Sequence, residues 1–175
     1  MTHTPFRPYQ DRISRSSALK LLQSACVGAD DGELFFERHT AESLVFDDGK
    51  LKNASYDASE GFGLRAVLGE VSGYAHSTEI SEASLKRASE TARLAIGAGG
   101  GVLADPPSAT NTRLYRDVDP ISEVSFTAKI DTLREMDAFL RDLDSRVVQV
   151  SASIAASLQE VTILRPDGIE VSDTR

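Results

Sequence analysis

The sequence has one cysteine, three histidines and no long apolar run, and each scarcity excludes a class of protein. Because Cys26 has no second cysteine to pair with, an internal disulfide is impossible, which fits a reducing cytoplasm. No apolar run approaches the roughly 20 residues that a membrane-spanning helix needs. The N-terminal segment is polar, contains Pro5 and Pro8, and lacks the apolar stretch of a signal peptide. We therefore expect a cytoplasmic protein without a membrane anchor.

The histidines are too dispersed for a local metal site. His3 lies in the N-terminal segment, His39 at a predicted strand end and His76 near the end of a later strand. Zinc sites combine several histidine, cysteine or carboxylate ligands at short, regular spacings, and no such grouping occurs here. We predict that this chain alone holds no zinc. Cys26 falls near the end of a predicted helix, where a small buried thiol is the expected role.

Basic residues are outnumbered: 27 aspartates and glutamates against 19 lysines and arginines give a net charge of −8. The electrostatic field of this negative net charge repels phosphate groups, and the sequence has no basic patch with neighbouring aromatic residues that would compensate for it. We therefore expect neither nucleic acid nor a membrane surface as a direct partner. The glycine runs at 97–101 and 61–63 do not lead from a strand into a helix, so neither has the context of a phosphate-binding loop.

What the sequence does contain is a series of short alternating segments between Glu33 and Ser77, interrupted by Asp-Gly, Glu-Gly and Gly-Glu pairs. This pattern is typical of an antiparallel β-meander. Its clearest strand, 62–68, places apolar residues on one face at every second position. The Asp47-Asp48-Gly49 segment is predicted to be a hairpin turn, because the ligand spacing of a calcium-binding loop is missing.

Helical spacing of apolar residues flanks the meander. Helices are predicted at about 11–27, 81–96 and 125–144, and further strands at 148–154, 161–164 and 169–171, the last two joined by a turn at 166–168. The predicted class is α+β: an antiparallel meander sheet of at least five strands, with the second and third helices packed on one face.

Domain organisation follows from the same pattern. Residues 1–10 are predicted to be a flexible N-terminal arm, and residues 11–175 a single α+β domain. The Gly-rich connection from Gly97 to Asn111 has no periodicity, and no role is assigned to it. The chain ends on a strand that nothing in the sequence covers, so we expect it to be the front part of a longer protein.

One strand of the meander offers a candidate binding surface. Gly61 and Gly63 make one face of it shallow, and Arg65 projects from that same face as a fixed cation. A peptide backbone or a carboxylate would fit such a strip. The alternative is structural: the glycines permit close packing, and Arg65 pairs with a meander carboxylate such as Glu37. We keep both interpretations open.

The meander, and above all its EGFGLRA segment, together with the later VDPIS segment, resembles the N-terminal region of the TldD branch of the TldD/PmbA family. The resemblance runs from about Asp31 to Arg175. It implies a bacterial, cytoplasmic zinc metallopeptidase, historically called a modulator of DNA gyrase. Such proteins trim or degrade unfolded peptides, among them microcin precursors and an antitoxin, as homodimers or with a PmbA/TldE paralogue.

The resemblance transfers no catalytic or metal-binding residue to this chain. The family's metal motif, His-Glu-x-x-x-His with a later cysteine, belongs to a region beyond Arg175, so zinc is expected only in the intact protein. Two hypotheses remain: an N-terminal domain that contributes a wall of a peptidase substrate cleft and part of a subunit interface, or a free-standing, non-enzymatic module that binds a peptide or protein at a sheet edge. The length of the parent reading frame separates them.

Overall fold

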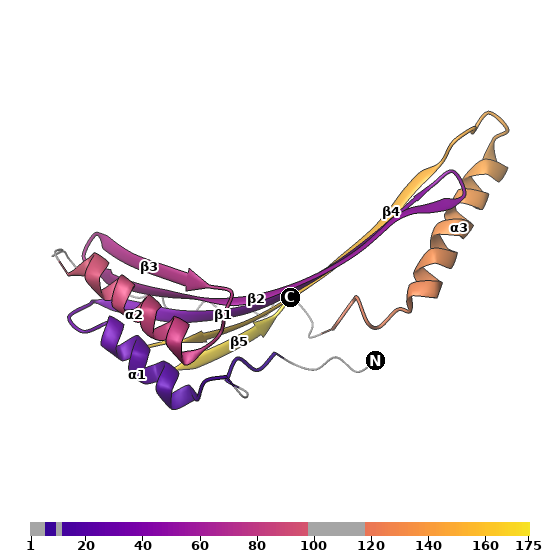
Figure 1. Cartoon of the computed structure of the whole chain (residues 1–175). Helices are drawn as coiled ribbons and strands as arrows, with labels where there is room; N and C mark the ends of the chain where they lie inside the picture. Colours follow the sequence, from indigo (N-terminus) through magenta and orange to yellow (C-terminus); the bar gives the residue numbers. More distant parts are fainter. Residues whose placement is uncertain (1–5, 10–11, 98–117) are drawn as a thin grey trace.

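A single antiparallel sheet of five strands organises the computed structural model, which describes residues 6–9, 12–97 and 118–175 (Figure 1). The order across the sheet is β3-β2-β1-β4-β5. The strands are β1 (Asp31–Asp47), β2 (Lys50–Leu68), β3 (Val71–Ser77), β4 (Ser151–Leu164) and β5 (Glu170–Thr174). The helices are α1 (Arg15–Ala25), α2 (Glu82–Ile96) and α3 (Phe126–Leu143). The predicted α+β class is confirmed.

The sheet is broad at one end and narrow at the other (Figure 1). The strands β1, β2 and β4 are 17, 19 and 14 residues long, whereas β3 pairs only with 62–68 of β2 and β5 only with 160–164 of β4. We call the five-stranded part the broad end. The three-stranded remainder, built from residues 38–47, 50–60 and 151–159, is called the ribbon.

The hairpin at the tip of the ribbon has the turn that its sequence predicts. Asp48 and Gly49 have φ angles of 50° and 73°. Positive φ at both central residues defines a turn whose twist matches the strands that it joins. Gly168, in the second predicted turn, has a φ of 87°. Both turns are therefore confirmed.

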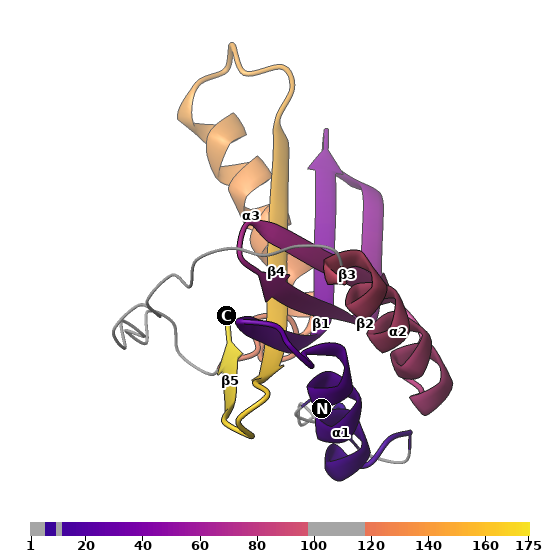
Figure 2. The same cartoon turned by 90° about the vertical axis from the view of Figure 1, so that its left-hand side faces the viewer.

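A hydrophobic core fills the broad end beneath α1 and α2. Leu34 and Phe36 of β1 and Leu64 of β2 are fully buried, and they face Leu22 of α1 and Leu85 of α2 in the same cluster. Figure 2 shows both helices beside this end of the sheet. The serine side chains of residues 14 and 81 accept hydrogen bonds from the first turns of α1 and α2, which satisfies amide groups that the helices leave free.

The described part of the N-terminal segment, residues 6–9, also contacts this helix-covered face. The Phe6 amide donates a hydrogen bond to Glu160 Oε1 at 2.8 Å. The Tyr9 ring meets the Phe36 ring edge-on, with 5.5 Å between centroids. Phe6 and Tyr9 thus extend the cover that α1 and α2 provide.

A second, smaller core lies at the ribbon under α3. It joins Leu44 and Phe46 of β1 to Ile130 and Leu133 of α3. Because alternate residues of a strand share a face, these β1 positions lie on the same side as Leu34 and Phe36. The prediction that the second and third helices pack on one face is confirmed.

The apolar stripe of α3 is only partly covered. Ile130 and Leu133 are buried, but Phe126, Met136 and Leu143 are 50%, 46% and 63% exposed. The ribbon is three strands wide, and it offers too little apolar surface to cover the whole stripe. Lys129 and Asp137 are buried instead, which the apolar spacing alone did not predict.

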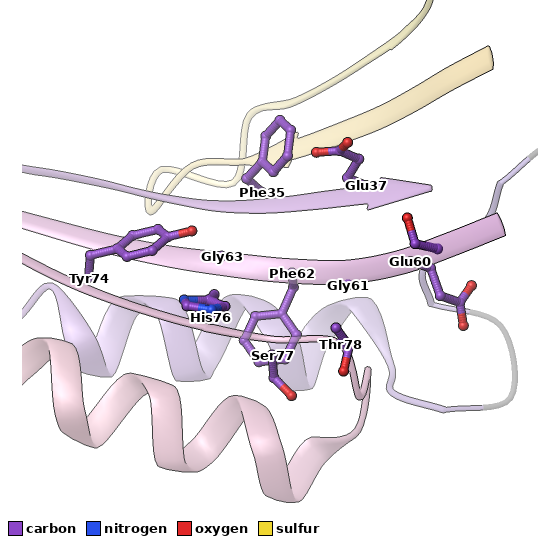
Figure 3. Close-up of a pocket in the computed structure, with 11 residues that line it drawn as sticks. Phe35, Glu37, Glu60, Gly61, Phe62, Gly63, Tyr74, His76, Ser77 and Thr78 are labelled. Carbon is purple, nitrogen blue, oxygen red and sulfur yellow. The ribbon is translucent and has the colours of Figure 1, made fainter. Parts of the chain in front are cut away.

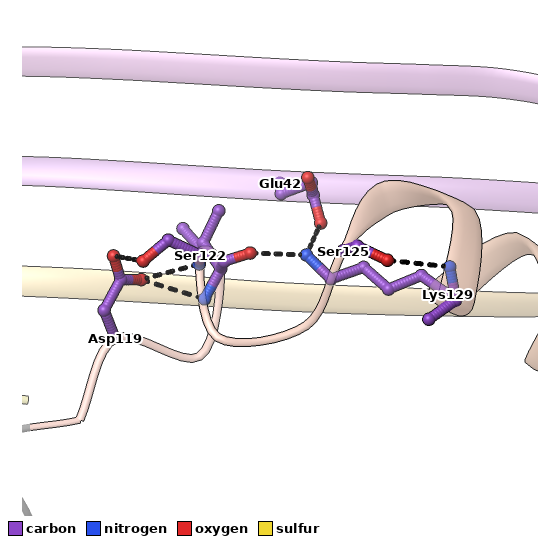
Figure 4. Close-up of polar contacts among 7 residues, drawn as sticks. Glu42, Asp119, Ser122, Ser125 and Lys129 are labelled. Carbon is purple, nitrogen blue, oxygen red and sulfur yellow. Dashed lines mark hydrogen bonds and ion pairs between the residues drawn. The ribbon is translucent and has the colours of Figure 1, made fainter. Parts of the chain in front are cut away.

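Polar contacts attach the start of α3 to the ribbon (Figure 4). Lys129 Nζ lies 2.5 Å from Glu42 Oε1 and 2.7 Å from the Ile121 carbonyl oxygen. The Asp119 carboxylate accepts hydrogen bonds from the amides of Ile121 and Ser122, so the VDPIS segment forms a tight turn that presents this carbonyl. That segment therefore has a structural role in the orientation of α3.

Several predicted bounds differ from the structure: the first helix, expected at about 11–27, spans Arg15–Ala25, and the last strand, expected at 169–171, spans Glu170–Thr174. Residues 151–164 form one strand, where two separate strands at 148–154 and 161–164 were predicted. The long β1 strand offers an unbroken pairing partner from Leu34 to Asp47, which holds the weakly patterned middle of β4 extended. For the same reason His39 lies inside β1 and not at a strand end.

Candidate functional site

The face of the sheet opposite the helices is uncovered by any described helix, and we call it the open face. Side chains at odd-numbered positions of β1 project from it. Pairing places Glu33, Arg65 and Tyr74 in one row across β1, β2 and β3. The next rows are Phe35, Gly63 and His76, and then Glu37 and Gly61. Gly61, Gly63 and Arg65 therefore share one face, as the sequence predicts.

A shallow pocket of about 220 Å³ lies over the two glycines (Figure 3). Its floor is Gly61 and Gly63. One side is formed by Phe35 and Glu37 of β1, and the other by β3, whose Tyr74 and His76 rings stack with 5.7 Å between centroids. The lining residues are Phe35, Glu37, Ser59, Glu60, Gly61, Phe62, Gly63, Tyr74, His76, Ser77 and Thr78.

The glycines also serve the close packing that the structural alternative proposed. A Cβ atom on Gly63 would lie 2.7 Å from the Tyr74 hydroxyl oxygen, and one on Gly61 would lie 2.7 Å from the Ser77 carbonyl oxygen. Larger residues would therefore displace the wall of the pocket or the chain after β3. The missing side chains therefore allow Tyr74 and the Ser77 carbonyl group to pack close to β2.

Arg65 pairs with Glu33, its direct neighbour across the strands. The distance from Arg65 Nε to Glu33 Oε1 is 3.0 Å, and the side chains are 44% and 31% exposed. The expected pairing of Arg65 with a meander carboxylate is confirmed, but the partner is Glu33 and not the suggested Glu37. Directly opposed side chains are the nearest cross-strand pairs, and Glu37 lies two rows further along β1.

Glu37 lies between two hollows of the open face. It lines the glycine pocket and also a larger depression of about 500 Å³, whose other residues are His39, Ser157, Gln159 and Arg175. Gln159 Nε2 donates a hydrogen bond to Glu37 Oε1 at 3.1 Å. Sequence reasoning missed Phe35, Glu37, Tyr74 and His76 as pocket residues. Their spacing of two along each strand is a signal, but only the strand register brings the two pairs together.

No grouping of three or more histidine, cysteine, aspartate or glutamate side chains suited to a metal ion occurs within residues 6–9, 12–97 and 118–175. The described residues therefore do not fit a catalytic metal. Cys26 is half-buried, and burial, followed by the charge of Asp31, raises the pKa of its thiol to about 11. It is consequently a poor nucleophile at neutral pH. None of the described helices is long and apolar enough to cross a membrane.

Family comparison matches two consecutive domains. Residues 32–96 match the family model described as PmbA/TldA metallopeptidase domain 1. Residues 119–175 match the PmbA/TldA metallopeptidase central domain. The first match contains the meander and α2, and the second contains α3, β4 and β5. Together the two matches account for most of the chain, in the order that the names imply.

Curated relatives are named metalloproteases. The chain is 31% identical over 167 residues to the metalloprotease TldD homolog of Buchnera aphidicola from Acyrthosiphon pisum, covering 94% of this chain and 35% of that protein. It is 34% identical over 150 residues to the metalloprotease TldD homolog of Haemophilus influenzae, covering 83% of this chain and 31% of that protein. The chain thus spans about a third of the length of these relatives.

Solved structures share the fold. TldE from Thermococcus kodakarensis is similar with a TM-score of 0.67 and 16% identity, over 90% of this chain and 36% of that one. A protein from Thermotoga maritima, named as a candidate modulator of a DNA gyrase, gives a TM-score of 0.67 and 14% identity, over 82% of this chain and 33% of that one. At such identities the likeness concerns the fold alone.

Proposed function

This chain belongs to the PmbA/TldD metallopeptidase family, and from that premise we propose that it is the N-terminal substrate-cleft and subunit-interface region of a TldD-like zinc peptidase. Its substrates would be unfolded peptides, cut during peptide maturation or antitoxin degradation in the cytoplasm. The zinc would be held by residues outside this chain. The supporting observation is the matched order of domain 1 and central domain along the sequence.

The open face has a surface, a pocket and an exposed cation that suit one wall of a peptide-binding cleft. It is a broad sheet surface with no described helix over it, and it carries a shallow pocket lined by Gly61 and Gly63. Arg65 stands beside the hollow and remains 44% exposed even while it pairs with Glu33. A guanidinium with free donors binds peptide carbonyl or carboxylate oxygens. We assign Gly61, Gly63 and Arg65 to the substrate-facing surface.

The test uses the complete protein that carries this chain, purified alone and with a PmbA/TldE-like paralogue. We expect cleavage of unfolded peptides, loss of cleavage on chelation, and recovery when zinc is added. Ser59→Trp, which fills the glycine pocket from an exposed position, should raise KM without change in thermal stability. Ser55→Trp, on the same face further along the ribbon, is the matched control. A protein without peptidase activity under all these conditions would contradict the proposal.

A second candidate function is a non-enzymatic module that binds a peptide or protein at a sheet edge. It is favoured by the outer edge of β2, where residues 50–61 extend beyond the pairing with β3, and where residues 50–59 are exposed. Such an edge is a template for an added strand. This candidate predicts binding of extended peptides without cleavage, and it requires no downstream metal motif in the reading frame.

A further inference from the structure

The glycine pocket combines one carboxylate with aromatic walls (Figure 3). Phe35 and Glu37 rise from β1 on one side of the floor, and Tyr74 reaches across it from β3. The Tyr74 side chain is 59% exposed, so its ring borders the hollow and is not buried in a core. The pocket therefore places a carboxylate beside two aromatic rings.

Glu37 differs from the neighbouring carboxylates because no lysine or arginine in the described part of the chain forms an ion pair with it. Glu33 is neutralised by Arg65, and Glu60, at the rim of the pocket, pairs with Arg12. The interaction that fixes Glu37 is the hydrogen bond from the neutral Gln159 amide at 3.1 Å. The geometry thus holds a carboxylate in place without cancelling its charge.

The size of the pocket limits the ligand. Its volume of about 220 Å³ is smaller than the roughly 300–1,000 Å³ of typical small-molecule sites. It suits a single side chain. Lysine and arginine combine an apolar stem with a cationic head, and cations are attracted both by carboxylates and by the faces of aromatic rings.

We propose that this pocket seats the lysine or arginine side chain of a peptide that lies across the open face. The inference rests on the proposed function and narrows it, since it names the residue type that the cleft wall recognises. Glu37 binds the cationic head, Phe35 and Tyr74 flank the stem, and Gly61 and Gly63 form the floor beneath it.

The experiment measures binding of two labelled five-residue peptides to the complete protein by fluorescence anisotropy, with a chelator present to prevent cleavage. One peptide has lysine at its centre and alanine elsewhere, and the other has norleucine in place of lysine. We expect the lysine peptide to bind about tenfold more tightly, the lower range for a hydrogen bond to a charged group. Glu37→Gln should abolish this preference, and Tyr74→Leu should reduce it.

Asp57→Asn is the matched control. Asp57 is an exposed carboxylate on the same face of β2 that does not line the pocket, so its loss should leave the preference intact. Equal affinity of both peptides, unchanged by Glu37→Gln, would overturn the basic-residue proposal and leave peptide processing standing. If Glu37→Gln changed the oligomeric state instead, the occupant would be a subunit, and the proposal would also fail. Absence of binding by either peptide would overturn this proposal and the proposed function together.

Discussion

Arg65 of β2 and Glu33 of β1 form an ion pair, with 3.0 Å between Arg65 Nε and Glu33 Oε1. Both side chains are partly exposed to solvent. Exposed pairs contribute about 0–1 kcal/mol to stability, because water screens the charges. Arg65→Ala should therefore leave the melting temperature of the complete protein almost unchanged. Peptide binding should suffer: we expect KM to rise by a factor equivalent to about 1.5–3 kcal/mol.

Glu33→Gln separates the two roles of Arg65. It removes the ion pair but keeps the arginine, so KM should stay close to that of the wild type or fall. A large drop in melting temperature for Arg65→Ala with unchanged kinetics would reject its contact with substrate.

Lys129 and Glu42 form a more enclosed pair, with side chains 6% and 14% exposed. Lys129→Met should destabilise the attachment of α3 by about 3 kcal/mol, because it leaves a carboxylate in a largely dry site without its partner. Hydrogen exchange of the α3 amides in the complete protein measures this local loss. The double variant with Glu42→Gln should recover most of it.

The control for the α3 prediction is Arg134→Ala. Arg134 and Asp131 form an exposed pair on the same helix, with side chains 63% and 52% exposed. Exchange at α3 should barely change in this variant. Equal protection in Lys129→Met and Arg134→Ala would show that the buried pair does not hold the helix in place.

Two glycines should respond differently to alanine. A Cβ atom on Gly73 would lie 2.2 Å from the Ala92 carbonyl oxygen, so Gly73→Ala must push the backbone of α2 away from β3. On Gly63 the nearest atom is the hydroxyl at the exposed end of Tyr74, which can swing aside. In denaturant titrations, we expect the free energy of unfolding to fall by about 1–3 kcal/mol for Gly73→Ala and by less than about 1 kcal/mol for Gly63→Ala. Equal losses of stability in the two variants would show that movement of the Tyr74 side chain does not relieve the contact at Gly63.

Cys26 should resist alkylation near neutral pH. Burial raises the pKa of its thiol from 9.0 to about 11, so at pH 8 the thiolate fraction is about a hundredfold below that of an ordinary thiol. Iodoacetamide labelling should be slow and should accelerate towards pH 11, whereas urea-unfolded protein should react at the ordinary rate. Fast labelling of the folded protein at pH 8 would contradict this environment.

The raised pKa of Cys26 also predicts how the stability of the protein depends on pH. The folded state keeps the proton of Cys26 between pH 9 and 11, where the unfolded state releases it. The contribution of Cys26 to the free energy of unfolding is therefore complete below pH 9 and declines as the pH rises towards 11. A Cys26→Ser variant should show a smaller decline over that interval in urea titrations at several pH values.

Local patterns were sufficient for much of the fold. The Ser81 cap of α2, the Asp48-Gly49 turn and the alternation along 62–68 depend on interactions within a few residues, so their structures follow from the sequence. The common face of Gly61, Gly63 and Arg65 was predictable for the same reason, since a strand has a period of two.

The tertiary structure determined which side chains of these helices and strands contact one another. The sequence could not show that Arg65 lies opposite Glu33, that Glu37 meets Gln159, or that Tyr74 crosses Gly63, because each contact depends on register between distant strands. It also could not separate the buried Lys129 from the exposed Phe126 on α3, since the narrow ribbon determines which part of the helix is covered. Periodicity specifies which side chains share a face, but only the pairing and packing of the whole sheet determine their neighbours.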